Sequence, residues 1–349
     1  MKKRYLIGFC GHLDRQVAGE NGQTLKTVSL LNELHNLYGE NNVFSTSTHI
    51  WKKRPITLLF RLIKMSFTCK NIVVLPDQNG IRIVIPLFRF LSLINHNVLI
   101  YCVVGAWLAE KLEKHKFLKR ACSKLRVILV ETSTLQRELG KIGIENTDIL
   151  KNFKELKKVK LSKKEYKLVS PVKCCFFSRV VEMKGIEDAI SVVKRNNAEN
   201  EKKIILDIYG PIDEEYYKTL MRVIGDDLYI SYKGQANAFE SVDIIKKYSY
   251  QFFPTRFKTE GIPGSVIDSF YAAVPVIASR WNSFMDIIVD GENGILFDIC
   301  DVDDFYKKTI YAIGLSDSDY TKLKKSTLKY SSEYSSAECV KVLIKYIED

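Results

Sequence analysis

Short apolar runs alternate with amphipathic segments along the whole chain. We expect strands at residues 5–10, 71–75, 98–104, 126–130, 173–178, 203–209, 228–232, 250–253, 275–278 and 294–297. We expect helices at residues 23–38, 106–117, 135–142, 185–193, 214–224, 242–248, 262–273, 304–313 and 335–347. Alternating strands and helices build parallel sheets with helices on both faces. The sequence therefore predicts an α/β fold.

The length and one irregular segment indicate two domains. A chain of 349 residues can form two cores of ordinary size. Residues 151–171 are dense in lysine and glutamate and have little apolar periodicity, so we expect the interdomain connection there. We predict α/β domains at 1–160 and 161–330 that face each other across a cleft. A C-terminal helix within 331–349 is expected to pack back over the hinge.

Composition limits the partners. The formal net charge of +12 is explained by binding to nucleic acid, anionic lipid headgroups or polyphosphate substrates. An equally good explanation is a lysine-rich surface that keeps the protein in solution. The eight cysteines include no CxxC pair, which argues against zinc and favours buried thiols in a reducing cytosol. No stretch of 18 uninterrupted apolar residues occurs, so we reject a transmembrane helix.

The segment 252–279 carries the strongest functional pattern. Glu260 and a Gly261–Gly264 loop follow a strand and precede a helix that contains Asp268. Pro263 suits the first turn of that helix, whose free N–H groups form an anion site. Carboxylates before and inside the helix can hold hydroxyl groups beside the anion. This combination suits a sugar nucleotide, which is a diphosphate flanked by two polyols.

Two basic residues lie near the start of the predicted second domain. Arg179 and Lys184 lie between a strand that ends near Phe177 and the next helix. Such cations can converge on a diphosphate and neutralise it as it departs. The alternative is that both are ordinary solvated residues at a helix start.

A glycine-rich loop follows the first strand. Gly11, Gly19 and Gly22 lie in it, without the GxGxxG pattern of dinucleotide-binding proteins. All five histidines are in the first half of the chain. If a histidine acts as a base, His12 in this loop is the best placed. The alternative is that His12 is simply solvated.

Two other patterns have structural alternatives. Asp301 and Asp303 have the DxD form of some metal–diphosphate sites, but we favour N-capping of the helix that follows. Residues 55–67 and 86–94 mix large apolar side chains with arginine and lysine. They suit either a headgroup layer of anionic lipid or helices that pack within the domain.

In order along the chain, these motifs resemble the family 4 retaining glycosyltransferases of the GT-B fold, which has two Rossmann-like domains. The matching segments of the second half are Phe177–Arg179 with Lys184–Gly185, Ile208–Pro211, Tyr232–Gly234, Glu260–Pro263 with Asp268, Pro275–Ala278 and Asp290–Gly294. The first half is similar to bacterial capsule and O-antigen transferases at Asn21–Thr24, Val104–Leu108, Val130–Thr132 and Asn152–Lys154. In this sequence Asp268 stands where the family has glutamate, Ser178 where it has glycine, and Val104–Gly105 where many relatives have histidine.

The resemblance implies a role for each site residue. The catalytic group would be Glu260, which holds the donor sugar, with Arg179 and Lys184 on the diphosphate. The donor-binding residues would be Gly261, Ile262, Gly264, Ser265, Val266, Asp268, Gly210 and Gly11. Of these, the N–H groups of Gly264, Ser265 and Val266 would face the phosphates, and Asp268 would hold the ribose. The acceptor-binding residues of the first domain would be His12, Gly22, Gln23 and Trp107.

The implied activity is a retaining, metal-independent glycosyltransferase without a cofactor. It would move a sugar from a nucleotide-sugar donor, with UDP as the default nucleotide, to a lipid-linked saccharide acceptor in bacterial surface polysaccharide synthesis. We expect a cytoplasmic protein at the inner face of the plasma membrane, attracted by anionic lipid, that binds no nucleic acid. The alternatives are a nucleotide-sugar epimerase of the same fold and a non-catalytic basic protein that binds nucleic acid or lipid.

Overall fold

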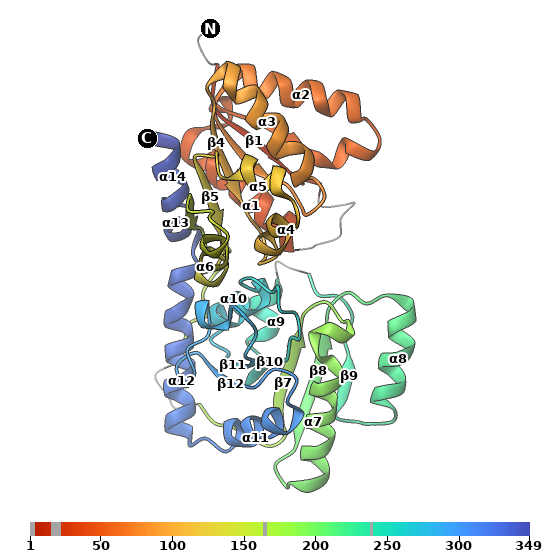
Figure 1. The fold of residues 1–349 in the computed structure, drawn as a ribbon. Helices are drawn as coiled ribbons and strands as arrows, with labels where there is room; N and C mark the ends of the chain where they lie inside the picture. Colours follow the sequence, from red (N-terminus) through yellow and green to blue (C-terminus); the bar gives the residue numbers. More distant parts are fainter. Residues whose placement is uncertain (1–3, 15–21, 163–165, 238–239) are drawn as a thin grey trace. The chain divides into compact units, whose positions relative to one another are not determined.

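The protein folds as two compact units (Figure 1). The structure is a computed structural model that describes residues 4–14, 22–162, 166–237 and 240–349. The first unit comprises Met1–Glu155 with Tyr334–Asp349, and the second comprises Leu156–Glu333. Each unit contains one six-stranded sheet, and the strand pairs of the described residues are all parallel. The predicted α/β class is confirmed, and the predicted limits 160 and 330 differ from these units by a few residues.

In the first unit the strand order is β2-β1-β3-β4-β5-β6. The strands are β1 (Tyr5–Gly11), β2 (Val43–Ser47), β3 (Cys69–Leu75), β4 (Val98–Cys102), β5 (Val127–Val130) and β6 (Thr147–Ile149). The order reverses between β1 and β3, so loops that leave these two strands diverge to opposite sides of the sheet. The short strands β2 and β6 were not predicted.

Helices cover both faces of this sheet. They are α1 (Gly22–Tyr38), α2 (Pro55–Thr68), α3 (Ile81–Asn95), α4 (Leu108–Lys114), α5 (Lys116–Cys122), α6 (Ser133–Lys141), α13 (Ser336–Cys339) and α14 (Lys341–Glu348). Helices α1 and α14 share one core with the sheet, and α2 to α6 share the other. The prediction of a single helix at 106–117 and at 335–347 is wrong, because the helical conformation is interrupted at His115 and at Val340.

Helices α2 and α3 pack side by side over the second of these cores (Figure 1). Leu58 and Leu62 of α2, and Ile85 and Phe88 of α3, are buried. Both segments are therefore packing helices, although each also exposes apolar residues on its outer side. No helix among the described residues has the length and apolar character that crossing a bilayer requires.

In the second unit the strand order is β12-β11-β10-β7-β8-β9. The strands are β7 (Val172–Phe177), β8 (Ile204–Tyr209), β9 (Ile230–Tyr232), β10 (Tyr250–Phe253), β11 (Val276–Ser279) and β12 (Gly294–Phe297). The order reverses between β7 and β10, which is the doubly wound arrangement. Ligands of such sheets bind beyond the carboxyl ends of the strands at this reversal.

The helices of the second unit bury their apolar sides against this sheet. They are α7 (Ile186–Glu199), α8 (Glu214–Ile224), α9 (Ser241–Ile245), α10 (Gly264–Tyr271), α11 (Val302–Ile313) and α12 (Asp317–Tyr330). Helices α7, α8 and α11 share one core with alternate residues of the strands, such as Phe176 and Phe252. Over the whole chain seven cysteines are buried as free thiols, whereas Cys300 is exposed.

Candidate functional site

An ion pair joins the two strands at the reversal of the second sheet. Lys184 ends a short 3₁₀ helix, η3 (Glu182–Lys184), that follows β7, and Glu260 lies in the loop after β10. The ammonium of Lys184 donates to Glu260 Oε2, and the two side chains are 9% and 17% exposed. The structure thus brings together two predicted site residues that are 76 positions apart.

Aromatic rings and a threonine surround this ion pair. Lys184 Nζ lies 5.3 Å from the ring centroids of both Phe253 and Phe257. Buried Thr255 donates a long hydrogen bond (3.4 Å) to the same carboxylate oxygen of Glu260. Aromatic faces and a carboxylate stabilise the buried ammonium. Lys184 is therefore a compensated cation and not the solvated residue of the alternative interpretation.

Arg179 has a different environment. It lies two residues after the end of β7, is exposed, and makes no hydrogen bond or ion pair with any described residue. Its positive charge is thus uncompensated, whereas the charge of Lys184 is offset by Glu260. An exposed guanidinium can bind a phosphate through two parallel hydrogen bonds.

Backbone contacts fix the two loops against each other. Gly185 has φ +73°, and a Cβ there would stand 2.0 Å from the carbonyl oxygen of Pro254. Arg256 N donates to Met183 O (2.9 Å), and the Arg256 side chain makes two hydrogen bonds to Asp188 of α7. With the Asp188 carboxylate as its acceptor, the pKa of Arg256 is raised. These contacts fix the loop that carries Lys184 against the loop that carries Glu260.

Helix α10 begins beside Glu260 without a side-chain cap. The amides of Gly264 and Ser265 donate to no described residue, and both residues are partly exposed. The amide of Val266, the third amide expected to face the phosphates, donates to Pro263 O (3.1 Å). Two free amides at a helix start still form an anion site.

The remaining predicted donor residues lie around this helix. Gly261 and Ile262 are buried in the loop before it, and Asp268, inside it, is 2% exposed. Gly210 follows β8 with φ +149°, and a Cβ there would stand 1.8 Å from Ser178 O. Its amide already donates to Gly234 O. Gly210 is therefore required by close backbone packing.

The first unit places Gly11 and His12 at the carboxyl end of β1. A Cβ on Gly11 would meet the Thr27 methyl group at 2.5 Å, so this glycine lets α1 approach the strand. The His12 ring packs edge-on against His49, with centroids 5.4 Å apart, and His49 Nε2 lies 3.6 Å from Asp14 Oδ2. His49 was not predicted as a site residue, because its position becomes informative only once β2 is known.

A second buried ion pair lies near the same edge. Lys26 of α1 donates to Glu131 after β5 (2.7 Å), with both side chains at most 3% exposed. Glu131 also accepts the amide of Gly105 (3.0 Å), which has φ +82°. The pair therefore anchors the loop that carries Trp107. In the sequence Glu131 stands out only as part of the Val130–Thr132 motif, and Lys26 was not predicted. A carboxylate that ends an apolar strand is nevertheless a signal of a buried partner.

The other predicted acceptor residues belong to α1 and to this loop. Gly22 and Gln23 begin α1. The Trp107 indole donates to Val104 O (2.8 Å), so only its ring remains for a ligand. Gly19 and Asn21 lie outside the described residues.

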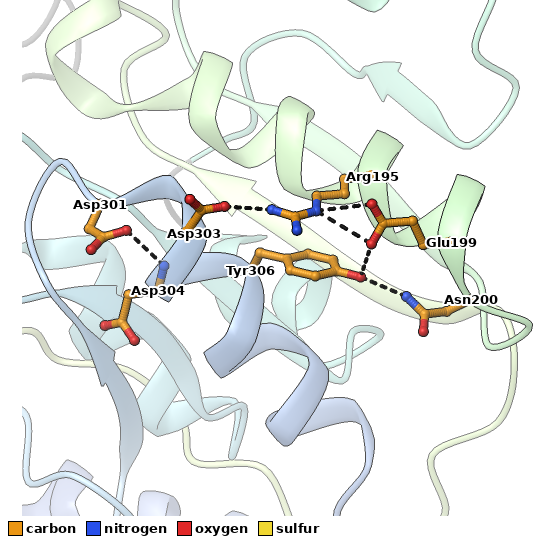
Figure 2. Close-up of polar contacts among 7 residues, drawn as sticks. All are labelled: Arg195, Glu199, Asn200, Asp301, Asp303, Asp304 and Tyr306. Atoms are coloured by element: carbon orange, nitrogen blue, oxygen red, sulfur yellow. Dashed lines mark hydrogen bonds and ion pairs between the residues drawn. The ribbon is translucent and has the colours of Figure 1, made fainter.

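The Asp301–Asp303 pattern is a structural feature. Asp301 caps α11 by accepting from the amide of Asp304 (2.8 Å), as predicted. Asp303 pairs with Arg195 of α7 (2.6 Å), and the Arg195 guanidinium lies 4.1 Å from the ring centroid of Tyr306. Figure 2 shows the two carboxylates engaged with these different partners. Among the described residues no group of three or more His, Cys, Asp or Glu could hold a metal ion.

The fold and this edge of the second sheet define a protein of the GT-B type. The structure is similar to that of Anabaena Alr3699/HepE in complex with UDP and glucose, with a TM-score of 0.73, 12% identity, and coverage of 98% of this chain and 99% of that chain. It is also similar to the lipopolysaccharide outer core galactosyltransferase WaaB, with a TM-score of 0.69, 14% identity, and coverage of 98% and 99%.

The family follows from the sequence. The profile described as "Glycosyl transferases group 1" matches residues 152–329, just over half of the 349 residues. The chain belongs to this family. An uncharacterized glycosyltransferase of Methanocaldococcus jannaschii is 26% identical over 132 residues, which are 37% of this chain and 33% of that protein. The match therefore spans about a third of this curated relative.

Proposed function

We propose that this glycosyltransferase transfers a sugar from a UDP-sugar to a lipid-linked saccharide, with retention of the anomeric configuration and without a metal ion. The observation that carries the proposal is the Lys184–Glu260 ion pair beside the free amides of α10. It combines a carboxylate that can hold sugar hydroxyls with donors that can hold phosphate. HepE, which has a similar fold, was solved in complex with UDP and glucose, and this supports UDP as the nucleotide of the donor.

In the proposed reaction the acceptor oxygen bonds to the anomeric carbon on the face from which the diphosphate leaves. The acceptor proton passes to the departing phosphate oxygen. Arg179 and the free amides of α10 stabilise the charge that develops on the diphosphate. Glu260 holds the donor sugar, and Asp268 holds the ribose from inside α10.

The biological setting is also part of the proposal. WaaB is a lipopolysaccharide galactosyltransferase, and a similar role in bacterial surface polysaccharide synthesis suits a basic protein. We propose that the chain works at the cytoplasmic face of the membrane. An epimerase of the same fold is disfavoured because residues 161–330 contain no histidine.

Binding and product analysis test the proposal. We expect UDP and one UDP-sugar to raise the melting temperature of the wild type, with or without EDTA. Glu260→Gln should lose turnover with that donor, whereas Lys246→Met, which changes an exposed ion pair, should keep it. Nuclear magnetic resonance of the product should show the donor's anomeric configuration. An inverted product, a requirement for metal, or full turnover by Glu260→Gln would contradict the proposal.

A further inference from the structure

The buried ion pair of the first unit joins four segments at the carboxyl edge of the first sheet. Lys26 comes from α1, and Glu131 comes directly after β5. The ammonium of Lys26 also donates a long hydrogen bond (3.5 Å) to Leu150 O, directly after β6. The second oxygen of the carboxylate accepts the amide of Gly105, which follows β4. Because both side chains are at most 3% exposed, any effect on a ligand must pass through these segments.

The turn after β4 depends on Glu131 for its conformation. Gly105 has φ +82°, in the left-handed region that favours glycine. Its amide donates to Glu131 Oε2 at 3.0 Å. Without this acceptor the amide loses a hydrogen bond to a charged group, and a glycine turn can then adopt several conformations. The carboxylate of Glu131 therefore selects one conformation of the turn.

The same turn carries Trp107 as an aromatic surface. The indole N–H donates to Val104 O (2.8 Å), which ties the ring to the turn itself. Lys111 Nζ, one helical turn further along, lies 5.8 Å from the ring centroid. The side chain is only partly buried, so part of the ring is open to a ligand. The orientation of this ring follows the conformation of the turn.

An aromatic ring at this place suits the saccharide of an acceptor. Ligands of parallel sheets bind beyond the carboxyl ends of the strands, where this turn lies. An aromatic ring offers a flat apolar surface on which the C–H face of a sugar can pack. The Lys184–Glu260 pair and the free amides of α10, proposed to hold the donor, belong to the second unit. The first unit is therefore available for the acceptor.

We propose that Lys26 and Glu131 are positioning residues of the acceptor site. The ammonium of Lys26 fixes the carboxylate of Glu131, and the carboxylate fixes the turn at Gly105. Trp107 is thereby held in the orientation in which its ring receives the acceptor saccharide. The inference rests on the proposed sugar transfer, and it assigns control of the acceptor to two side chains that do not touch it.

Two double variants separate the hydrogen bond to Gly105 from the ion pair. Lys26→Met/Glu131→Met (the methionine variant) and Lys26→Met/Glu131→Gln (the glutamine variant) both remove the two charges. Neither leaves a buried charge without a partner, so both should fold. Both also keep the net charge of the wild type. Only glutamine retains an oxygen that can accept the amide of Gly105, so the glutamine variant is the matched control.

Quenching of tryptophan fluorescence by iodide reports the state of the turn without any activity. Trp51→Phe, introduced into all proteins, removes an exposed tryptophan, and Trp281 is 1% exposed. Iodide should therefore reach only Trp107. We expect the quenching constant to rise roughly twofold in the methionine variant, because a loosened turn exposes the whole ring. The glutamine variant should match the wild type, and equal quenching of the two variants would overturn the inference.

Kinetics with and without an acceptor report the function of the pair. The acceptor is the lipid-linked saccharide extracted from the cells that make this protein, and the donor is the UDP-sugar that binds the wild type. In the methionine variant the apparent kcat/KM for transfer should fall about 10- to 100-fold, as expected for a small misplacement of a substrate. Hydrolysis of the donor by water needs no acceptor and should not fall. The glutamine variant should keep both rates.

The outcomes distinguish this inference from the proposed function. Equal loss of transfer in both variants, or loss of hydrolysis together with transfer in the methionine variant, would indicate a general structural role and overturn the inference. Full transfer by the methionine variant would overturn it as well. A wild type that neither binds UDP nor transfers a sugar would contradict the proposed function, and the acceptor role of the pair would fall with it.

Discussion

Lys184 and Glu260 meet at the one place in the second sheet where neighbouring strands β7 and β10 send their loops to opposite sides. The pair therefore ties together the two halves of a doubly wound sheet. It also occupies the position at which such sheets bind ligands. Structural and functional roles coincide in these two side chains, and experiments must separate them.

A double-mutant cycle makes that separation. Lys184→Met leaves a largely buried carboxylate without its ion pair, so we expect a loss of about 3 kcal/mol in the free energy of unfolding of the second unit. Adding Glu260→Gln should recover part of this loss, because no uncompensated charge remains. Turnover should stay lost in both variants. Urea unfolding and activity assays of the four proteins measure the two effects.

The control for this cycle is the exposed pair Lys246–Asp243, whose side chains are 47% and 72% exposed. Its removal should change neither stability nor turnover measurably, because exposed ion pairs contribute little. If Lys184→Met were as stable as the wild type, the pair would not be buried in the way described.

The Lys26–Glu131 pair predicts a loss confined to the first unit. Lys26→Met leaves the carboxylate of Glu131, which is 2% exposed, without its cation and with the amide of Gly105 as a donor. We expect a destabilisation of about 3–5 kcal/mol, typical of a broken buried pair. Hydrogen exchange should speed up in peptides of α1, β4 and β5 and stay unchanged in β7 to β12. Uniform acceleration throughout the chain would contradict this assignment.

Lys324 in α12 predicts a pH dependence. It is 6% exposed, and burial lowers its pKa from 10.5 to about 8. Below pH 8 the lysine is charged in both states and the penalty for burying the charge is complete. Between pH 8 and 10.5 the unfolded chain binds more protons, so the free energy of unfolding rises with pH.

Lys324→Met should therefore stabilise the second unit by roughly 2–3 kcal/mol at pH 7 and abolish the rise. Urea unfolding at several pH values from 7 to about 9.5, below the range in which tyrosine titrates, measures both. The neighbouring exposed Lys325→Met is the matched control and should retain the rise. A wild-type stability that falls over this range would show that another group dominates.

Gly185→Ala should disrupt the site through the backbone alone. Its Cβ would stand 2.0 Å from Pro254 O, and φ is +73°. We expect a loss of stability of more than about 3 kcal/mol, together with loss of UDP binding. Gly291→Ala separates the cost of backbone strain from that of a steric clash. Gly291 also has a positive φ (+79°), but nothing lies within 4 Å of a Cβ placed there. That variant should lose only about 1 kcal/mol and bind UDP normally.

The alternation of strands and helices was visible in the sequence because most strands are continuous buried runs. Strand β2, Val43–Ser47, escaped because its sequence VFSTS is polar and it lies at the edge of the sheet. Strand β6 has only three residues, all partly exposed. The break between α4 and α5 was invisible, because the apolar spacing continues past His115 while the backbone there leaves the helical region.

The site was only partly accessible to sequence reasoning. The glycine and proline loop before α10 marked Glu260, and the cap at Asp301 followed from its position before α11. The pairing of Lys184 with Glu260 depends on β7 and β10 being neighbours, which local patterns do not specify. The contacts of Lys26 with Glu131 and of His49 with His12 depend in the same way on the order of the strands.

The chain passes between the units twice, since the first unit includes Tyr334–Asp349. Leu343 and Ile347 of α14 are fully buried in the core that contains α1. During synthesis the first unit therefore lacks part of its core until these residues have left the ribosome, although its sheet emerges long before. The second unit can fold first, and until α14 emerges the nascent chain presents to chaperones a face of the first sheet that α1 covers only in part.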